Sequence, residues 1–230
     1  MITIEKLTVS YGSGEPVIRS LELQLARNMI HGIVGLNGAG KTTLLDTIYG
    51  LKKPSEGIVL LDGRKIAKAD IAYLITENFF YSGITGREYL ALFRNDAFNT
   101  DDWNVLFSLP LDKIIDNYST GMKKKLALLG VLKQNKPVLM LDEPFNGLDM
   151  EACRNIRLIL LRLCALGKTV IITSHIMETL TNLCDYIHYM DKGVVKFTVG
   201  KADFKEFEER IFTLLEEKNK ELVDKLTDKL

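Results

Sequence analysis

The sequence predicts an α/β protein with a mostly parallel sheet core, an N-terminal antiparallel β region and an inserted helical subdomain. Apolar segments such as IHGIVG, VLMLDE and TVIITSH alternate with helical segments along the chain. That order is typical of a parallel sheet covered on both faces. Near the start, ITIEKLTVSY and VIRSLELQL alternate apolar and polar residues around the turn GSGEP. In the middle, apolar residues recur at helical spacing over a long stretch.

The elements can be justified in chain order. The two alternating segments predict an antiparallel pair of strands. IHGIVG predicts a buried strand, and KTTLLDTIYG predicts a helix that ends with Gly50 as its C-terminal cap. GIVLLDGR and IAYLIT predict further strands.

The middle of the chain is predicted to be helical. The segments TGREYLALF, TDDWNVLFSL and TGMKKKLALLGVL carry apolar residues three and four positions apart. They interrupt the strand–helix order, so we expect a helical subdomain at about residues 77–135 inside a domain that spans residues 1–200. Strand VLMLDE, helix MEACRNIRLILLRLCALG, strand TVIITSH, helix METLTNLC and strands YIHYMD and VVKFTV complete this domain.

Residues 201–230 predict a charged amphipathic helical tail. Its apolar residues share roughly one helix face; they are Phe204, Phe207, Ile211, Leu215, Leu222 and Leu226. We favour a helix packed on its own domain, with a dimer contact as the alternative.

The composition limits the classes of function. The chain has 230 residues, with 30 Lys plus Arg against 30 Asp plus Glu, so its formal net charge is zero. Nucleic-acid-binding proteins usually carry a basic surplus, so no nucleic-acid partner is expected. We expect no signal peptide and no membrane span, since the apolar segment IRLILLRLCALG is interrupted by Arg157 and Arg162.

The three cysteines predict reduced, buried thiols of a cytosolic protein. Cys153 and Cys164 fall in one predicted helix at a distance of roughly 16 Å, too far apart for a disulfide bond.

The segment GLNGAGKT at residues 35–42 fits the phosphate-loop pattern G-x-x-x-x-G-K-[ST] between a strand and a helix. Glycines allow a concave loop whose N–H groups face phosphate oxygens, and the helix points its positive end at the same place. The sequence therefore predicts a P-loop NTPase that binds ATP, with Lys41 on the β- and γ-phosphates and Thr42 on Mg²⁺. The expected ATP-binding residues here are Gly35, Leu36, Asn37, Gly38, Ala39, Gly40, Lys41, Thr42 and Thr43.

The acid pair Asp142 and Glu143 follows the apolar strand VLML. The carboxyl edge of such a sheet is where ligands bind. We expect Asp142 to hold Mg²⁺ and Glu143 to act as general base on the attacking water. His175 ends another strand at this edge and is a candidate contact for the γ-phosphate. Taken alone, the acids could cap a turn and the histidine could start a helix.

In order and spacing, these motifs resemble the ATP-binding-cassette (ABC) transporter ATPases over about residues 1–200. The resemblance implies that NGLD at residues 146–149 is the D-loop, with Asp149 as its acid. It also implies that Tyr11 stacks on adenine, although a tyrosine in a strand needs no function.

The segment YSTGM at residues 118–122 occupies the position of the family signature Leu-Ser-Gly-Gly-Gln. Ser119 and Gly121 match it, whereas Tyr118, Thr120 and Met122 depart from it. The resemblance implies that Ser119, Thr120 and Gly121 act in trans, together with Asp149, on ATP bound to a second subunit. Of the three lysines that follow, at most two can face the phosphates, because successive helix residues turn by about 100°.

The family glutamine that ligates Mg²⁺ after strand IAYLI is absent here. Thr76 and Glu77 are the candidates for this position. We favour Glu77 because its carboxylate has the longer reach and is the stronger Mg²⁺ ligand. A loop in which neither residue contacts metal is the alternative.

These features together favour a transporter ATPase. The resemblance implies a homodimer or heterodimer of ABC ATPase subunits, peripheral on the cytoplasmic face of the membrane under a separate membrane permease. The signature is similar to those of ABC-2-type exporters, which suggests export. A soluble ABC ATPase that acts on nucleic acid or ribosomes is the alternative, and a module that binds ATP without turnover is disfavoured by Glu143.

Overall fold

The computed structural model describes residues 1–12, 14–207, 209, 211, 213 and 224–227. Its strands form two sheets, ordered β2-β1-β4-β5 and β10-β9-β3-β8-β7-β6. The first comprises β1 (Ile2–Ser10), β2 (Pro16–Leu25), β4 (Glu56–Leu61) and β5 (Arg64–Lys65). The second comprises β3 (Ile30–Val34), β6 (Ile71–Leu74), β7 (Val138–Asp142), β8 (Thr169–Ser174), β9 (Tyr186–Asp191) and β10 (Val194–Gly200).

Strand direction agrees with the predicted fold class. β1 pairs antiparallel with both β2 and β4, as the alternating pattern predicts. In the larger sheet, neighbours from β9 through β3, β8 and β7 to β6 are parallel, and only β10 runs antiparallel. All five residues of β3 and of β7 are buried, which is why apolar residues dominate both strands instead of alternating regularly with polar ones.

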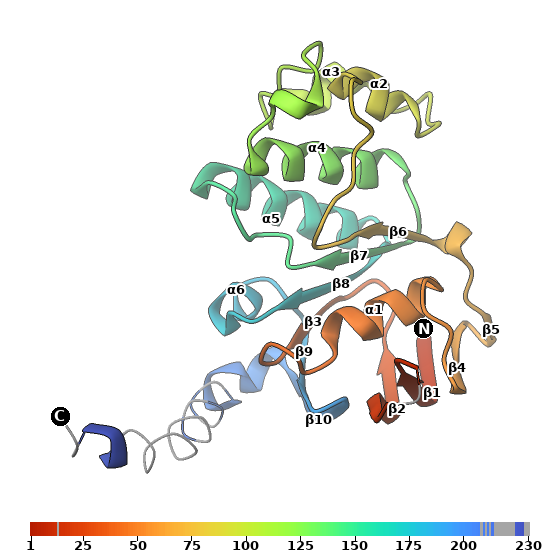
Figure 1. The fold of residues 1–230 in the computed structure, drawn as a ribbon, viewed down its shortest axis with the longest axis vertical. Helices are drawn as coiled ribbons and strands as arrows, with labels where there is room; N and C mark the ends of the chain where they lie inside the picture. Colours follow the sequence, from red (N-terminus) through yellow and green to blue (C-terminus); the bar gives the residue numbers. More distant parts are fainter. Residues whose placement is uncertain (13, 208, 210, 212, 214–223, 228–230) are drawn as a thin grey trace.

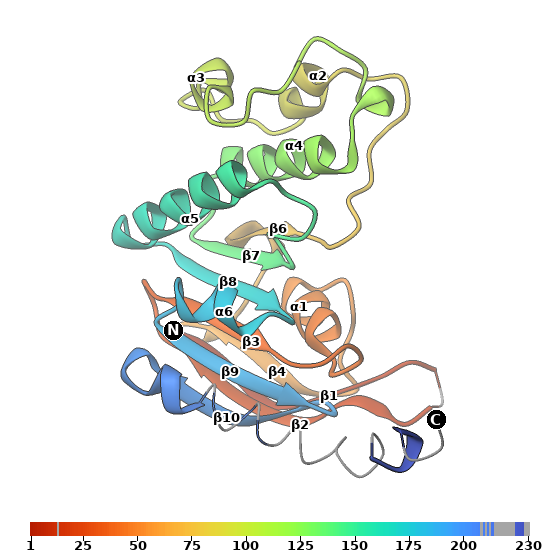
Figure 2. The ribbon, with the colours of Figure 1, turned by 90° about the vertical axis from the view of Figure 1, so that its left-hand side faces the viewer.

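Of the α-helices labelled in Figure 1, some pack on the larger sheet and others lie farther from it. They are α1 (Lys41–Tyr49), α2 (Gly86–Ala91), α3 (Thr100–Asn104), α4 (Thr120–Lys133), α5 (Met150–Ala165) and α6 (Met177–Thr181), with 3₁₀ turns at Lys68–Asp70, Ile115–Asn117 and Lys201–Asp203. Figures 1 and 2 show α4 and α5 at the β6–β7 end of the sheet, with α2 and α3 farther out. None of the helices in the described part of the chain has the length and apolar composition needed to span a bilayer.

The buried side chains form two clusters on the two faces of the larger sheet. Along β8, Val170 and Ile172 join a cluster with α4 and α5, whereas Ile171 joins a cluster with α1 and the smaller sheet. This alternation follows from the period of two in a strand. The sheet edge that carries the predicted motifs is thus held between two packed layers.

Local polar contacts set several element ends. Gly50 caps α1 with φ 81°, as predicted. The expected helix TDDWNVLFSL stops at Asn104, because the Asn104 amide bonds both the N–H and the C=O of Leu109 (2.9 Å each) and turns the chain. The expected strand GIVLLDGR is broken at Asp62 and Gly63, whose φ values of 52° and 80° make a turn between β4 and β5.

The tail packs on its own domain where the structure describes it. Phe204, Phe207 and Ile211 are buried in the cluster with α4 and α5, and the rings of Phe207 and Phe197 lie 6.5 Å apart. Leu226 is exposed. Leu215 and Leu222 lie outside the described residues.

The cysteines correct one expectation. All three are free thiols, but only Cys184 is buried, while Cys153 and Cys164 are half-buried. Cys153 and Cys164 lie near opposite ends of α5. Because α5 is amphipathic, only one stripe of its residues faces the core, and these two cysteines are not among its fully buried residues.

Candidate nucleotide-binding site

Residues 35–40 connect the end of β3 to the start of α1. A Cβ atom at Gly35 would lie 2.2 Å from the carbonyl oxygen of Met190, so only glycine allows this close approach. Gly40 precedes α1 with φ 103°, a conformation that L side chains rarely adopt. The loop therefore curves back over the N-terminus of α1, the end of a helix that favours anions.

Lys41 is buried against this loop. Its ammonium donates to the carbonyl oxygens of Gly35 (2.7 Å) and Leu36 (3.3 Å). Burial lowers the pKa of Lys41, while the nearby charges of Glu143 and Asp142 raise it. The loop thus holds the ammonium of Lys41 close to the carboxylates of Asp142 and Glu143.

A cleft of about 430 Å³ opens beside the phosphate loop. Elements far apart in the sequence meet in it, as the parallel topology predicts. Its lining residues are Val17, Asn37, Gly38, Ala39, Gly40, Lys41, Thr42, Thr43, Thr76, Glu143, Asn146 and His175. Gly35 and Leu36, also predicted to bind ATP, do not line the cleft and instead present their carbonyls to Lys41.

Asp142 is fully buried at the end of β7. The hydroxyls of Thr42 and Thr76 donate to its Oδ2 atom at 2.7 and 2.6 Å, and Thr173 donates to its Oδ1 atom. Buried carboxylates require such donors. Carboxylate and hydroxyl oxygens are also ligands of the kind that Mg²⁺ takes, so Thr42 and Asp142 fit the predicted metal site.

The side chains of Glu143 and His175 contact each other in the cleft. The imidazole Nδ1 atom lies 3.1 Å from each carboxylate oxygen of Glu143, and Asn146 donates to Oε2 at 3.3 Å. The structure therefore brings together Lys41, Asp142, Glu143 and His175, which the sequence assigned to one sheet edge.

Two contact residues were missed by the sequence reasoning. Thr173 bridges the acid pair, because its Oγ1 donates to Asp142 and accepts the N–H of Glu143 at 3.0 Å. The parallel register of β7 and β8 pairs Asp142 with Thr173, and alignment of the two strand ends could have found it. Asn146 stands three residues after Glu143 within the predicted D-loop, but no spacing rule marked its amide.

Of the two candidates for the missing glutamine, Thr76 reaches Asp142 and lines the cleft. Both residues are exposed, but Glu77 is not among the cleft residues. A metal contact of Glu77 therefore remains a prediction.

Tyr11 lies in a bend after β1, next to the first turn of α1. Its hydroxyl is 3.0 Å from Thr43 Oγ1, and the ammonium of Lys52 lies 3.3 Å from its ring centroid. An exposed ring in this position can stack on a planar base once Lys52 moves away from the ring face.

The signature residues lie on α4, away from the cleft of their own chain. Ser119 caps α4 by accepting the N–H of Met122 at 3.2 Å, and both Ser119 and Thr120 are exposed. None of Ser119, Thr120, Gly121 or Asp149 lines the described cleft. Asp149 caps α5 and forms an ion pair with Lys125 at 2.6 Å.

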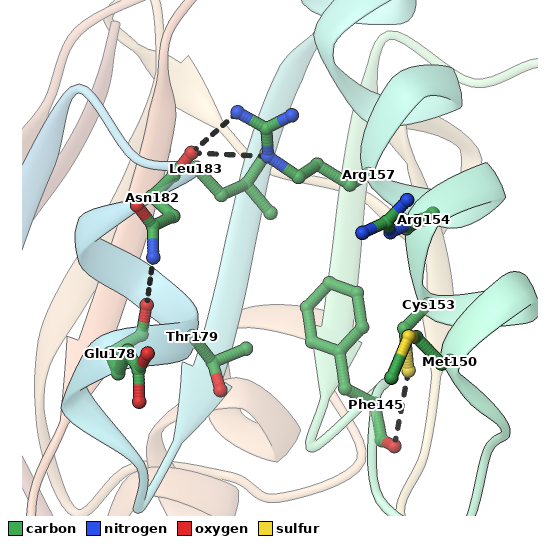
Figure 3. Close-up of a pocket in the computed structure, with 9 residues that line it drawn as sticks. All are labelled: Phe145, Met150, Cys153, Arg154, Arg157, Glu178, Thr179, Asn182 and Leu183. Carbon is green, nitrogen blue, oxygen red and sulfur yellow. Dashed lines mark hydrogen bonds between the residues drawn. The ribbon is translucent and has the colours of Figure 1, made fainter.

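A second pocket, of about 450 Å³, lies between α5 and α6 (Figure 3). Arg157 crosses it and donates to the carbonyl oxygen of Asn182 at 3.2 and 2.9 Å. This pocket shares no lining residue with the nucleotide cleft. The contact between Arg157 and Asn182 joins the end of α6 to α5.

The fold and the cleft define a phosphate-loop NTPase. A comparison with protein families matches residues 18–146 to the family described as ABC transporter. The chain belongs to this family of ATPases.

Two curated relatives illustrate the similarity. The bacitracin transport ATP-binding protein BcrA of Enterococcus faecalis is 31% identical, over 84% of this chain and 67% of the relative. A putative ABC transporter ATP-binding protein of Listeria monocytogenes is 29% identical, over 85% of this chain and 80% of the relative.

Solved structures share the fold. An ATP-binding subunit of an ABC transporter superposes with a TM-score of 0.78 at 24% identity, covering 90% of this chain and 93% of the other. A dimeric ATP-binding cassette in a post-hydrolysis state, bound to ADP and Pi, gives a TM-score of 0.76 at 22% identity, covering 87% and 99% of the two chains.

Proposed function

We propose that this chain is the ATP-hydrolysing subunit of an exporter and works through a separate membrane permease. The observation that carries the proposal is the meeting of Lys41, the Thr42–Asp142 pair and the Glu143–His175 pair in one cleft. Such a cleft offers a cation for phosphate oxygens, oxygen ligands for a metal and a base beside a histidine.

The residues have distinct roles in this proposal. Lys41 and the loop N–H groups bind the phosphates of ATP, and Tyr11 stacks on the adenine. Thr42 and Asp142 hold Mg²⁺, which would neutralise phosphate charge. Glu143 takes the proton of the attacking water, and His175 orients the Glu143 carboxylate.

Dimerisation completes the site in the same proposal. Ser119 caps the N-terminus of α4, and it is exposed rather than turned into its own cleft. We infer that Ser119, Thr120, Gly121 and Asp149 meet ATP bound to the partner subunit, in a homodimer or heterodimer. ATP binding closes the pair, and hydrolysis opens it.

Two relatives support the proposal of export. A Nod factor export ATP-binding protein from Rhizobium meliloti is 32% identical over 84% of this chain, and BcrA is a bacitracin transport protein. The helical subdomain at about residues 77–135 would hold the permease on the cytoplasmic face of the membrane, where ATP is available. The alternative of a nucleic-acid or ribosome ATPase is not favoured, because these relatives are transport proteins and the net charge is zero.

ATP binding and turnover by the purified full-length chain test the proposal. Wild type should hydrolyse ATP only when Mg²⁺ is present. Lys41→Ala should weaken ATP affinity, because the phosphates lose their fixed cation. Unchanged affinity of Lys41→Ala, measured by fluorescent-ATP titration, would show that the phosphates bind elsewhere.

A further inference from the structure

The side chain of Lys124, in the first half of α4, is buried. Its ammonium donates to the backbone carbonyl oxygen of Glu143. Burial lowers the pKa of Lys124, while the charges of Glu143 and Asp142 raise it. An ammonium is costly to bury without a partner, so this placement requires a compensating interaction.

Glu143 has a backbone conformation that needs support. Its φ is 49°, in the left-handed region that non-glycine residues rarely adopt. The residue is held at both ends, because its N–H donates to Thr173 Oγ1 at 3.0 Å and its carbonyl accepts from Lys124. With the backbone fixed in this way, the carboxylate reaches His175 at 3.1 Å.

The start of α4 contacts the loop after Glu143 at further points. Lys125 forms an ion pair with Asp149 at 2.6 Å. A Cβ atom at Gly121 would lie 3.0 Å from the carbonyl oxygen of Gly147, so helix and loop are close-packed. Residues 143–149 are therefore held to α4 from one end to the other.

We propose that Lys124 is a positioning residue for ATP hydrolysis, which fixes the backbone of Glu143 in its own chain and so links α4 to the catalytic acid. The inference rests on the proposed role of Glu143 as base. Lys124 does not line the nucleotide cleft, so it acts through Glu143 rather than on ATP. Removing its ammonium should leave the Glu143 carbonyl with only the N–H of Asn146, at 3.3 Å, and so loosen the contact of the carboxylate with His175.

The first test compares Lys124→Met, which has no donor, with Lys124→Gln, which keeps a donor. Both side chains are one atom shorter than lysine, so the two variants differ mainly in the donor. In the full-length protein, Lys124→Met should lower kcat about tenfold or more, with KM for ATP within about twofold of wild type. Lys124→Gln should recover a large part of kcat. Lys133→Met, in the last turn of the same helix, is the matched control.

Thermal unfolding of each variant separates positioning from stability. Wild-type kcat in Lys124→Met, a defect confined to KM, or no recovery in Lys124→Gln would overturn the proposal. If Lys124→Met does not fold, the kinetics of Lys124→Gln test the proposal alone. The shorter glutamine side chain should lower kcat severalfold without changing KM, and a wild-type kcat in this variant would contradict a positioning role for Lys124.

A mixing test assigns the effect to one site. Lys124→Met chains are mixed with Ser119→Arg chains, using Ser119→Arg with Lys41→Ala as the reference mixture. If Lys124 acts on its own Glu143, both lesions fall in one shared site and activity recovers on mixing. Recovery in the reference mixture alone would overturn the proposal. If activity does not recover in the reference mixture either, the shared site itself is refuted. The kinetic comparison of Lys124→Met with Lys124→Gln would then still test the role of Lys124.

Discussion

The imidazole of His175 contacts both carboxylate oxygens of Glu143, with Nδ1 at 3.1 Å from each. Since a carboxylate oxygen accepts, His175 donates from Nδ1. The pair comes from the ends of the neighbouring strands β7 and β8, so sheet register sets its geometry. A carboxylate held in this way can take a proton without first changing its rotamer.

Glu143→Gln should stop steady-state hydrolysis and preserve ATP binding. The amide keeps the shape of the side chain but cannot take a proton from water, and a general base contributes roughly 10²- to 10⁴-fold. The variant should also accumulate as an ATP-bound dimer, visible by light scattering after size-exclusion chromatography. Turnover close to wild type would exclude Glu143 as the base.

Thr76 is expected to matter more for Mg²⁺ than Glu77. Although residue type favoured Glu77, Thr76 is the residue that donates to Asp142 at 2.6 Å and lines the cleft. Thr76→Val keeps the shape and removes the donor. It should raise the Mg²⁺ concentration for half-maximal hydrolysis up to about tenfold, because a hydrogen bond to a charged group contributes roughly 1.5 kcal/mol.

Glu77→Gln is the matched variant for this titration. Its curve should overlap that of wild type. A larger shift for Glu77→Gln than for Thr76→Val would restore the carboxylate as the metal ligand in this loop.

Most of the predicted residues that line the candidate cleft could be placed there from the sequence, because they are neighbours in one loop or follow from the order of the strands. The phosphate loop is contiguous, and parallel strands bring Asp142 and His175 to one edge. The sequence did not predict which lysine after Gly121 is buried, since the helical turn separates their directions but tertiary packing fixes the rotation of α4. It favoured Glu77 over Thr76 for its reach and charge. It could not show which of the two side chains reaches Asp142, because a shift of one residue in a loop reverses which side chain faces the site.

Mixed subunits should reveal a shared active site. A Ser119→Arg chain damages the partner's site, and a Lys41→Ala chain damages its own. Either homodimer has two damaged sites, whereas a mixed dimer collects both lesions in one site and leaves the other intact. ATPase activity should therefore rise on mixing to a fraction of wild type. Constant activity in a sample whose mixed dimers are verified by differential tags would mean that Ser119 acts within its own chain.

The last prediction concerns a buried histidine pair, His31 and His188, on the neighbouring strands β3 and β9. Nδ1 of His31 lies 3.1 Å from Nε2 of His188, and Nε2 of His31 lies 3.0 Å from the carbonyl oxygen of Ala26. Nδ1 of His188 lies 2.9 Å from Thr198 Oγ1. Because the carbonyl can only accept, His31 carries its proton on Nε2, His188 donates to His31, and Thr198 donates to His188. One neutral arrangement thus satisfies every contact.

Protonation of this pair should destabilise the fold. Burial lowers the pKa of His31, against opposing effects of its bond to Ala26 and the charge of Asp185. Burial, followed by the charge of His31, lowers the pKa of His188 to about 3. The ring of Tyr186, which stacks on His31 at 5.6 Å, also faces the pair.

The sign of the pH effect follows from these depressed values. Unfolded histidines bind protons below a pH of about 6.5, and the folded pair does not, so this stability is complete above about pH 6.5 and is lost as the pH falls towards 3. Between pH 7 and pH 5, the depressed pKa of His188 alone should reduce the free energy of unfolding by about 2 kcal/mol. Urea titrations of wild type and His188→Gln at pH 7 and pH 5 measure it. The stability gap between wild type and His188→Gln should shrink by about this amount at pH 5. Parallel curves for wild type and His188→Gln would mean that the buried pair accepts protons without loss of stability.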